Sequence, residues 1–183
     1  MDGQTPLLGD YFVVSGAGTI GRLISVGEWL NGDGFGPWDH AGVYVGNGQV
    51  VEAEPHGARL APADEYADRA IVWSTGGFDL TEAQRAAIAD AARGFLGVPY
   101  SFLDYLAIAA HRFHLPGGPF LRHYVATTKH MICSQLVDAS YEKAGVHLFD
   151  DHRWPGYVTP ADLHRLAVAP PDRPRSTAGT DAV

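Results

Sequence analysis

The chain contains 183 residues, of which 46% are apolar, and it carries a formal net charge of −8. This length and apolar content are sufficient for one domain with a proper core. The negative charge argues against a surface that binds nucleic acid or anionic membranes. No segment approaches the roughly 18 consecutive apolar residues that a membrane-spanning helix needs.

The two ends of the chain and its cysteine content bear on where the protein acts. The N-terminal segment MDGQTPLLGDYF has neither a basic nor an apolar signal region, so we expect no secretory signal and a cytoplasmic location. The lone Cys133 excludes an internal disulfide and is compatible with that location, although export by a non-classical route or by phage lysis stays open. Residues 169–183 lack periodicity and are predicted to be a disordered tail, which leaves 1–168 as the domain.

The N-terminal part of the chain predicts a strand, a helix and a glycine-rich loop. Residues 11–14 follow Gly9-Asp10 and predict a short buried strand, and residues 16–30 predict a helix that ends at Asn31-Gly32. The loop that follows lacks the lysine and hydroxyl residues of a phosphate-binding loop. We interpret it as a rim that presents Trp38 beside His40, where Trp38 is a candidate substrate-binding residue.

The central stretch, residues 39–54, predicts a β-hairpin that carries one histidine and two carboxylates. A three-residue loop at 46–48 predicts three cross-strand pairs: Val45 with Gln49, Gly42 with Glu52 and His40 with Glu54. His40, Glu52 and Glu54 then share one face, because side chains alternate with a period of two. A two-residue turn at Asn47-Gly48 would instead place His40 on the opposite face. We favour the first register, since it lets a carboxylate hold the imidazole ring.

Further elements follow in chain order. The patterns predict a short strand at 57–60, a turn or short helix at 61–68, a strand at 70–74, a helix from the Thr81–Gln84 capping box to about residue 93, a second helix at 101–113, and a last short helix that starts at Thr159-Pro160.

Cys133 precedes a predicted helix over residues 134–144 that ends at Gly145. At a helix start, the macrodipole and the free N–H groups favour a thiolate over a thiol. The alternative is that Cys133 is a small buried apolar residue, as most free cysteines are. A cysteine in the first turn of a helix, facing a histidine that a carboxylate orients, is the papain-type catalytic arrangement.

Several motifs carry a resemblance. The segments Gly97-Val98-Pro99-Tyr100, Cys133-Ser134-x-Leu136-Val137 with Tyr141, and His40 to Gly48 resemble the motifs of the NlpC-type cysteine peptidase superfamily. The histidine strand here precedes the cysteine by 93 residues, the reverse of the usual order. The chain therefore resembles the circularly permuted branch, which includes the lecithin:retinol acyltransferase-like enzymes, over roughly residues 9 to 165. The resemblance implies an α+β, permuted papain-like fold, in which an antiparallel sheet packs against helices.

The residues and the resemblance together assign catalytic roles. Cys133 is the candidate nucleophile and His40 the candidate general base. The resemblance places the third catalytic residue twelve positions after the histidine, at Glu52. Glu54 is the competitor and a candidate substrate-binding residue, because geometry alone does not separate the two acids. The backbone N–H of Cys133 is a candidate oxyanion donor, and Tyr100 is either a second donor and substrate-binding residue or a core aromatic.

A metal site is the second chemistry that the histidines suggest. His111 and His114 are spaced i,i+3, with His123 and His130 downstream, but no acid or cysteine joins them at ligand spacing and no HExxH motif occurs. We therefore interpret them as helix or surface histidines and predict neither a metal nor another cofactor.

Three functions fit these residues. The leading one is a thiol hydrolase that cleaves amide bonds, in peptides or N-acyl compounds, such as the γ-D-glutamyl or muropeptide bonds that the resemblance implies. The second is a lipid acyltransferase or phospholipase, although Ile132-Cys133-Ser134-Gln135 replaces the Asn-Cys-Glu-His motif typical of those relatives. The third is a non-catalytic binding module. The expected partner is a small peptide, acyl-amide or lipid; the oligomeric state stays open.

Overall fold

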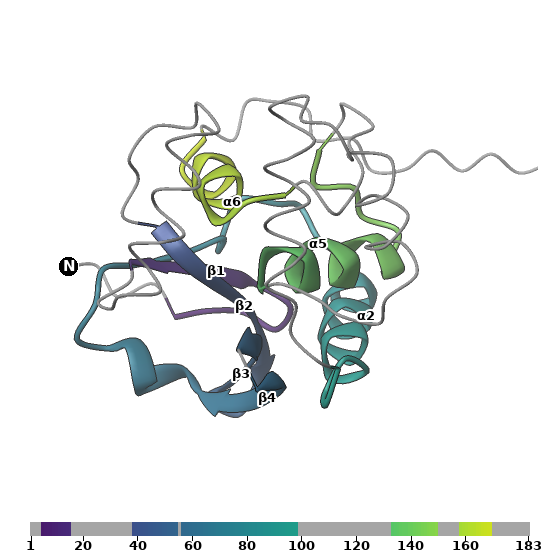
Figure 1. Ribbon diagram of the computed structural model, residues 1–183. Coiled ribbons are helices and arrows are strands. Elements are labelled where there is room, and N and C mark those ends of the chain that lie inside the picture. The colour runs from purple at the N-terminus through teal and green to yellow at the C-terminus, as the bar shows by residue number, and fades with distance from the viewer. Residues whose placement is uncertain (1–4, 16–37, 55, 99–132, 150–157, 170–183) are drawn as a thin grey trace, which may run out of the picture.

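The computed structural model describes residues 5–15, 38–54, 56–98, 133–149 and 158–169. These residues form a mixed α+β fold with a five-stranded antiparallel sheet in the order β4-β3-β2-β1-β5 and three α-helices (Figure 1). The elements in chain order are β1 (Tyr11–Ser15), β2 (Trp38–Gly46), β3 (Gln49–Glu54), β4 (Gly57–Pro62), the 3₁₀ helix η1 (Ala63–Tyr66), β5 (Ile71–Trp73), α2 (Glu82–Arg93), α5 (Cys133–Lys143) and α6 (Pro160–Ala167).

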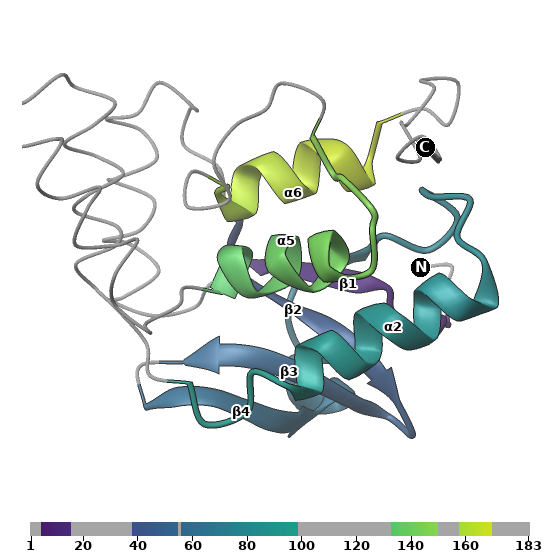
Figure 2. The same ribbon diagram turned by 90° about the vertical axis from the view of Figure 1, so that its right-hand side faces the viewer.

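The sheet has a different apolar cluster on each face. Tyr11 and Val13 of β1 pack with the helices, whereas Phe12 and Val14 pack on the other face near Tyr66 of η1. This alternation follows from the period of two along a strand. The helices α2, α5 and α6 all contact β2, and Figure 2 shows α5 lying between α2 and α6. Strand β1 is therefore buried on both faces, as its apolar run predicts.

Most predicted elements in the described ranges are confirmed with small shifts of their ends. Helix α2 begins at the expected capping box, in which the Thr81 side chain and the Gln84 side chain each bond the backbone of the other residue. Helix α6 has a second capping box between Thr159 and Asp162. Gly145 follows α5 in a left-handed conformation with φ 74°. The helices expected at 16–30 and 101–113, and the tail from residue 170, lie outside the described residues. Within the described ranges, no helix is long and apolar enough to cross a membrane.

The turn of the central hairpin corrects one prediction. Asn47 (φ 54°) and Gly48 (φ 69°) form a two-residue turn, and Gly46 rather than Val45 pairs with Gln49. Two successive positive φ angles suit the right-handed twist of the flanking strands, which explains why this turn is favoured over a three-residue loop. The register then shifts by one residue between Tyr44 and Gly46.

This shift is a β-bulge, and it restores the predicted register for the rest of the hairpin. Beyond it, Tyr44 pairs with Val50 and Gly42 pairs with Glu52. One extra residue in one strand turns the side chains beyond it to the opposite face of the sheet relative to the partner strand. The bulge therefore brings Glu52 to the face of His40, where the two-residue turn alone would have separated them.

Gly42 leaves no room for a side chain beside Glu52. A Cβ atom there would lie 2.7 Å from the Phe12 Cε1 atom, 2.8 Å from the Val51 carbonyl oxygen and 3.1 Å from the Glu52 Cβ atom. We expect Gly42→Ala to lower the free energy of unfolding by about 1–3 kcal/mol, because a backbone and a packed ring must both move. Urea denaturation followed by circular dichroism measures this change.

The matched control for that substitution is Gly48→Asn at the tip of the same hairpin. Gly48 has open space around a Cβ position, and asparagine tolerates its left-handed conformation better than other residues do. We expect its effect to be below about 1 kcal/mol. If Gly42→Ala is as mild as Gly48→Asn, the close packing of β2 against Glu52 is not important for stability.

Candidate active site

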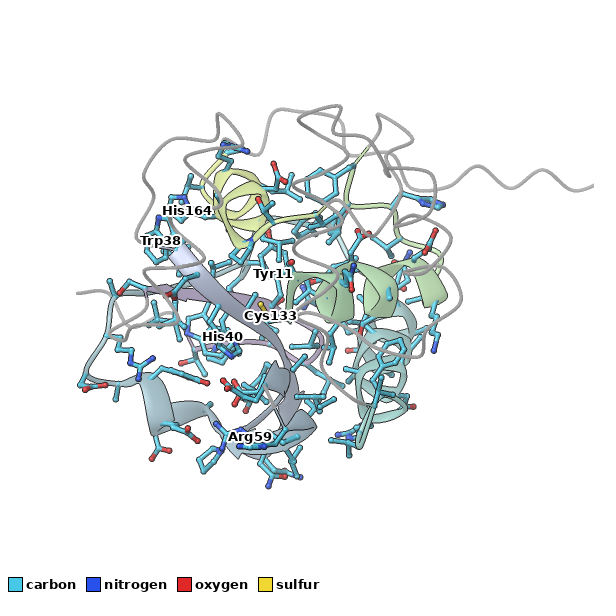
Figure 3. All side chains as sticks on the ribbon, in the orientation of Figure 1. Tyr11, Trp38, His40, Arg59, Cys133 and His164 are labelled. Atoms are coloured by element: carbon cyan, nitrogen blue, oxygen red, sulfur yellow. The ribbon has the colours of Figure 1, made fainter. Side chains whose placement is uncertain are left out.

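The side chains of Cys133 and His40 lie close enough to interact electrostatically although 93 positions separate them in the sequence. Cys133 is the first residue of α5 and is 1% exposed, and His40 lies on the adjoining strand β2 (Figure 3). The hydroxyl of Ser134 donates a hydrogen bond of 2.6 Å to the carbonyl of Val158, which fixes the start of α5. The structure thus brings the candidate cysteine and the candidate histidine to the same region, at the junction of α5 and β2.

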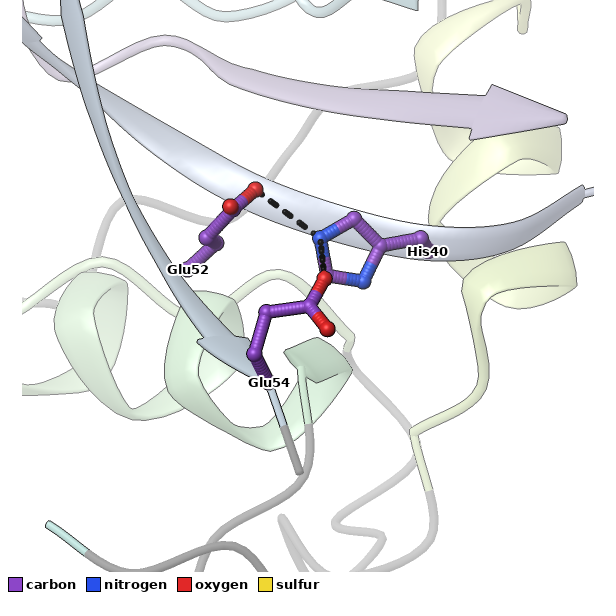
Figure 4. Close-up of side chains that lie close together, drawn as sticks. All are labelled: His40, Glu52 and Glu54. Carbon is purple, nitrogen blue, oxygen red and sulfur yellow. Dashed lines mark hydrogen bonds and ion pairs between the residues drawn. The ribbon is translucent and has the colours of Figure 1, made fainter. Parts of the chain in front are cut away.

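Two carboxylates approach the same ring nitrogen of His40 (Figure 4). The Nε2 atom is 2.9 Å from Glu52 Oε2, a hydrogen-bond distance, and 3.5 Å from Glu54 Oε1. Because Nε2 faces the carboxylates, Nδ1 is the nitrogen available to Cys133. The Glu52 side chain is fully buried, whereas the Glu54 side chain is 34% exposed. Distance and burial together favour Glu52 as the acid that orients the ring.

Two residues that were not predicted from the sequence hold Glu52. The Tyr66 hydroxyl donates a hydrogen bond of 2.6 Å to Glu52 Oε2, and Arg59 Nη2 lies 2.7 Å from Glu52 Oε1. The Arg59 contact is an ion pair without the geometry of a directed hydrogen bond. Arg59 is the cross-strand partner of Glu52 between β3 and β4. The register of that hairpin could therefore have predicted the contact between Arg59 and Glu52 from the sequence. Tyr66 lies on η1, where no periodic pattern points to Glu52.

The ionisation of the site follows from these contacts. Burial on its own lowers the pKa of His40, but the hydrogen bonds to Cys133 and Glu52 outweigh it and raise the pKa to about 10. Burial disfavours the charged form of Glu52 as well, which on its own raises the pKa of that carboxyl. The hydrogen bond and charge of His40, together with Tyr66 and Arg59, outweigh this effect and hold the pKa of Glu52 below its usual range. The site therefore favours an imidazolium ring beside an ionised carboxylate near neutral pH.

The other candidate residues lie at different places. The ring of Trp38 stacks on the ring of His164 of α6, with centroids 4.2 Å apart and an interplanar angle of 16°. Asp39 is 5% exposed, and burial raises its pKa, although the charges of His40 and Arg69 oppose this effect. Tyr100 lies outside the described residues, as do His111, His114, His123 and His130.

His40, Glu52 and Glu54 are the described residues that could together hold a metal ion, since their ligand atoms lie within 4.8 Å of one another. Glu52 already accepts the Tyr66 hydroxyl on one oxygen and faces the Arg59 guanidinium with the other. A cation would compete with both groups and with the His40 hydrogen bond. The donor set is therefore better suited to orienting the imidazole than to coordinating a metal.

The described residues thus define a mixed α+β fold that carries a hydrogen-bonded His–Glu pair next to a cysteine at a helix start. A comparison with protein-family models finds no match for this chain, and neither does a comparison with the sequences of curated proteins.

Proposed function

We propose that the chain is a thiol hydrolase that cleaves amide bonds through Cys133, His40 and Glu52. The observation that supports this most directly is the His40–Glu52 hydrogen bond of 2.9 Å, together with the position of Cys133 at the start of α5, within interaction range of His40. A thiol next to a histidine that a carboxylate orients is the arrangement needed to activate a nucleophile. The resemblance to the permuted NlpC-type enzymes, with the histidine strand ahead of the cysteine helix, agrees with this proposal.

The reaction proceeds in two halves. The Cys133 thiolate attacks the carbonyl carbon of the amide, and the protonated His40 gives its proton to the leaving nitrogen as the C–N bond breaks. The acyl group is then held as a thioester on Cys133. Water attacks this thioester, His40 accepts the proton of the water, and the C–S bond breaks to release the carboxylic acid. The backbone N–H of Cys133 is the oxyanion donor, because it lies at a helix N-terminus.

The substrate that we propose is a small acyl-amide, with cell-wall peptides as the first choice. This choice follows the resemblance to NlpC-type enzymes. Trp38 lies two positions before His40 on β2 with its ring stacked on His164, and we assign it to the rim of the substrate site because of this closeness in the strand.

The substrate class is tested by incubating the protein with purified peptidoglycan, N-acyl amino acids and phospholipids and identifying the products by mass spectrometry. The Cys133→Ala variant is the control for contaminating activities. We expect amide hydrolysis by the wild-type protein, with an acylated intermediate on Cys133 visible as a mass increase of the intact chain. Release of fatty acid from phospholipid alone would instead favour a lipid-directed enzyme. No product beyond the control would favour a binding module and contradict the proposal.

A further inference from the structure

Two carboxylates compete for one N–H group of His40. Glu52 and Glu54 are two positions apart on β3, so their side chains project from the same face of the strand. Both approach Nε2, at 2.9 Å and 3.5 Å. A single N–H can point well at only one of them, and the two choices turn the ring differently relative to Cys133. The spacing along β3 does not decide between the two acids.

The contacts around the two acids are unequal. Glu52 Oε2 accepts the Tyr66 hydroxyl, and Glu52 Oε1 faces the Arg59 guanidinium. Among the described residues, the ion pair of Glu54 is with His40 alone. The charged environment that stabilises a carboxylate is therefore concentrated on Glu52.

Tyr66 is itself held in place from several sides. It is 4% exposed, and its ring packs 5.3 Å from the Phe12 ring and 5.7 Å from the His40 ring, measured between centroids. The Arg69 guanidinium lies 5.3 Å from the centre of the Tyr66 ring. The phenol thus touches both members of the His40–Glu52 pair, the ring against the imidazole and the hydroxyl on the carboxylate.

We propose that Tyr66 and Arg59 are positioning residues that select Glu52 over Glu54 as the acid orienting His40. The inference rests on the proposed function, in which that orientation directs Nδ1 toward Cys133. A neutral phenol donates its hydrogen most strongly to an ionised oxygen, so the short Tyr66 bond favours the anionic form of Glu52. Arg59 adds a positive charge on the second oxygen. Tyr66 and Arg59 hold the Glu52 carboxylate in place, and that carboxylate orients the imidazole of His40.

The test compares two substitutions of tyrosine by phenylalanine. Tyr66→Phe removes the hydroxyl from Glu52, whereas the control Tyr44→Phe removes a hydroxyl that accepts the Gly48 backbone N–H at the exposed hairpin tip. The pKa of His40 is followed by NMR of histidine-labelled protein, with the signal assigned from a His40→Gln variant. We expect Tyr66→Phe to change this pKa by about one unit and Tyr44→Phe to change it by less than about 0.2 units.

Selection between the acids is tested by adding Glu54→Gln to each background. If Tyr66 holds His40 on Glu52, the His40 pKa falls more upon Glu54→Gln in the Tyr66→Phe protein than in the wild-type protein, because Glu54 has then taken over part of the role. An equal fall in both backgrounds, or equal effects of Tyr66→Phe and Tyr44→Phe, overturns the inference.

A second pair of variants covers the case in which Tyr66→Phe does not fold. Arg59→Gln alters a side chain that is 43% exposed, and Arg93→Gln is its control with the same exposed fraction. Loss of the Arg59 charge by itself raises the His40 pKa, so the readout is again the response to Glu54→Gln. We expect the fall of the His40 pKa upon Glu54→Gln to be larger in the Arg59→Gln protein than in the wild-type protein, and to be the same as in the wild-type protein in the Arg93→Gln protein. These titrations need no turnover. A Cys133→Ala protein that retains full hydrolysis would therefore end the proposed function, while the titrations alone decide the role of Tyr66 and Arg59.

Discussion

Replacing Cys133 by alanine is expected to reduce the proposed amide hydrolysis by at least about four orders of magnitude, because the proposed acyl intermediate forms on the Cys133 sulfur. Cys133 is buried in the apolar cluster between the sheet and the helices, so alanine leaves a small void. We expect a stability cost of about 1 kcal/mol, which leaves the fold intact. His40→Ala is expected to abolish turnover in the same way.

The measurement is the rate of product formation on the substrate identified by mass spectrometry, with circular dichroism as the check on folding. Ser140→Ala is the matched control, since it removes one buried polar atom from the same helix and away from His40. Its rate should stay within about threefold of the wild-type rate. Near-normal hydrolysis by Cys133→Ala would end the covalent mechanism, and a comparable loss in Ser140→Ala would assign the effect to packing.

Glu52→Gln is expected to lower the free energy of unfolding by about 3 kcal/mol near pH 6, because it leaves the protonated His40 and Arg59 without their shared anion. Glu54→Gln is expected to cost less than about 1 kcal/mol, since that carboxylate is 34% exposed and lies farther from the ring. The difference between the two variants measures how unequally the two acids contribute.

The pH dependence of this loss has a defined sign. The pKa of His40 rises from 6.5 to about 10 in the folded protein, so its stabilisation is complete below about pH 6.5 and is lost as the pH rises through 10. The pKa of Glu52 is lowered from 4.5, so its contribution is present above about pH 4.5 and is lost as the pH falls through its lower folded value. The effect of Glu52→Gln should therefore be largest between about pH 5 and 6.5 and should shrink toward pH 10. Urea denaturation at pH 6, 8 and 10 measures it, and a constant difference would contradict this electrostatic account.

The sequence predicted the elements that carry strong local signals. The alternating hairpin strands, the capping box at Thr81 and the glycine after α5 are each set by neighbouring residues. The register of the hairpin was predicted correctly beyond the bulge but from the wrong turn, since a bulge has no clear signature in the spacing of apolar residues.

The site was less completely predictable, for a physical reason. His40, Cys133 and the two acids have the residue types that catalysis needs, so the sequence could nominate them. Burial distinguishes Glu52 from Glu54, and it results from packing against Tyr66, fourteen positions away on an irregular element. Such contacts depend on tertiary structure, and a strand pattern that repeats every two residues cannot supply them.

The bulge in the central hairpin separates the length of the tip from the register of the strands below it. Five residues, 45–49, connect the paired positions Tyr44 and Val50. The bulge takes up one of these residues, so removing Gly46 would leave a plain two-residue turn with Val45 opposite Gln49 and the pairs Tyr44–Val50 and Gly42–Glu52 unchanged. Loop grafts and natural length variants at this tip are therefore compatible with the proposed chemistry when they keep Tyr44 opposite Val50, whatever their number of residues.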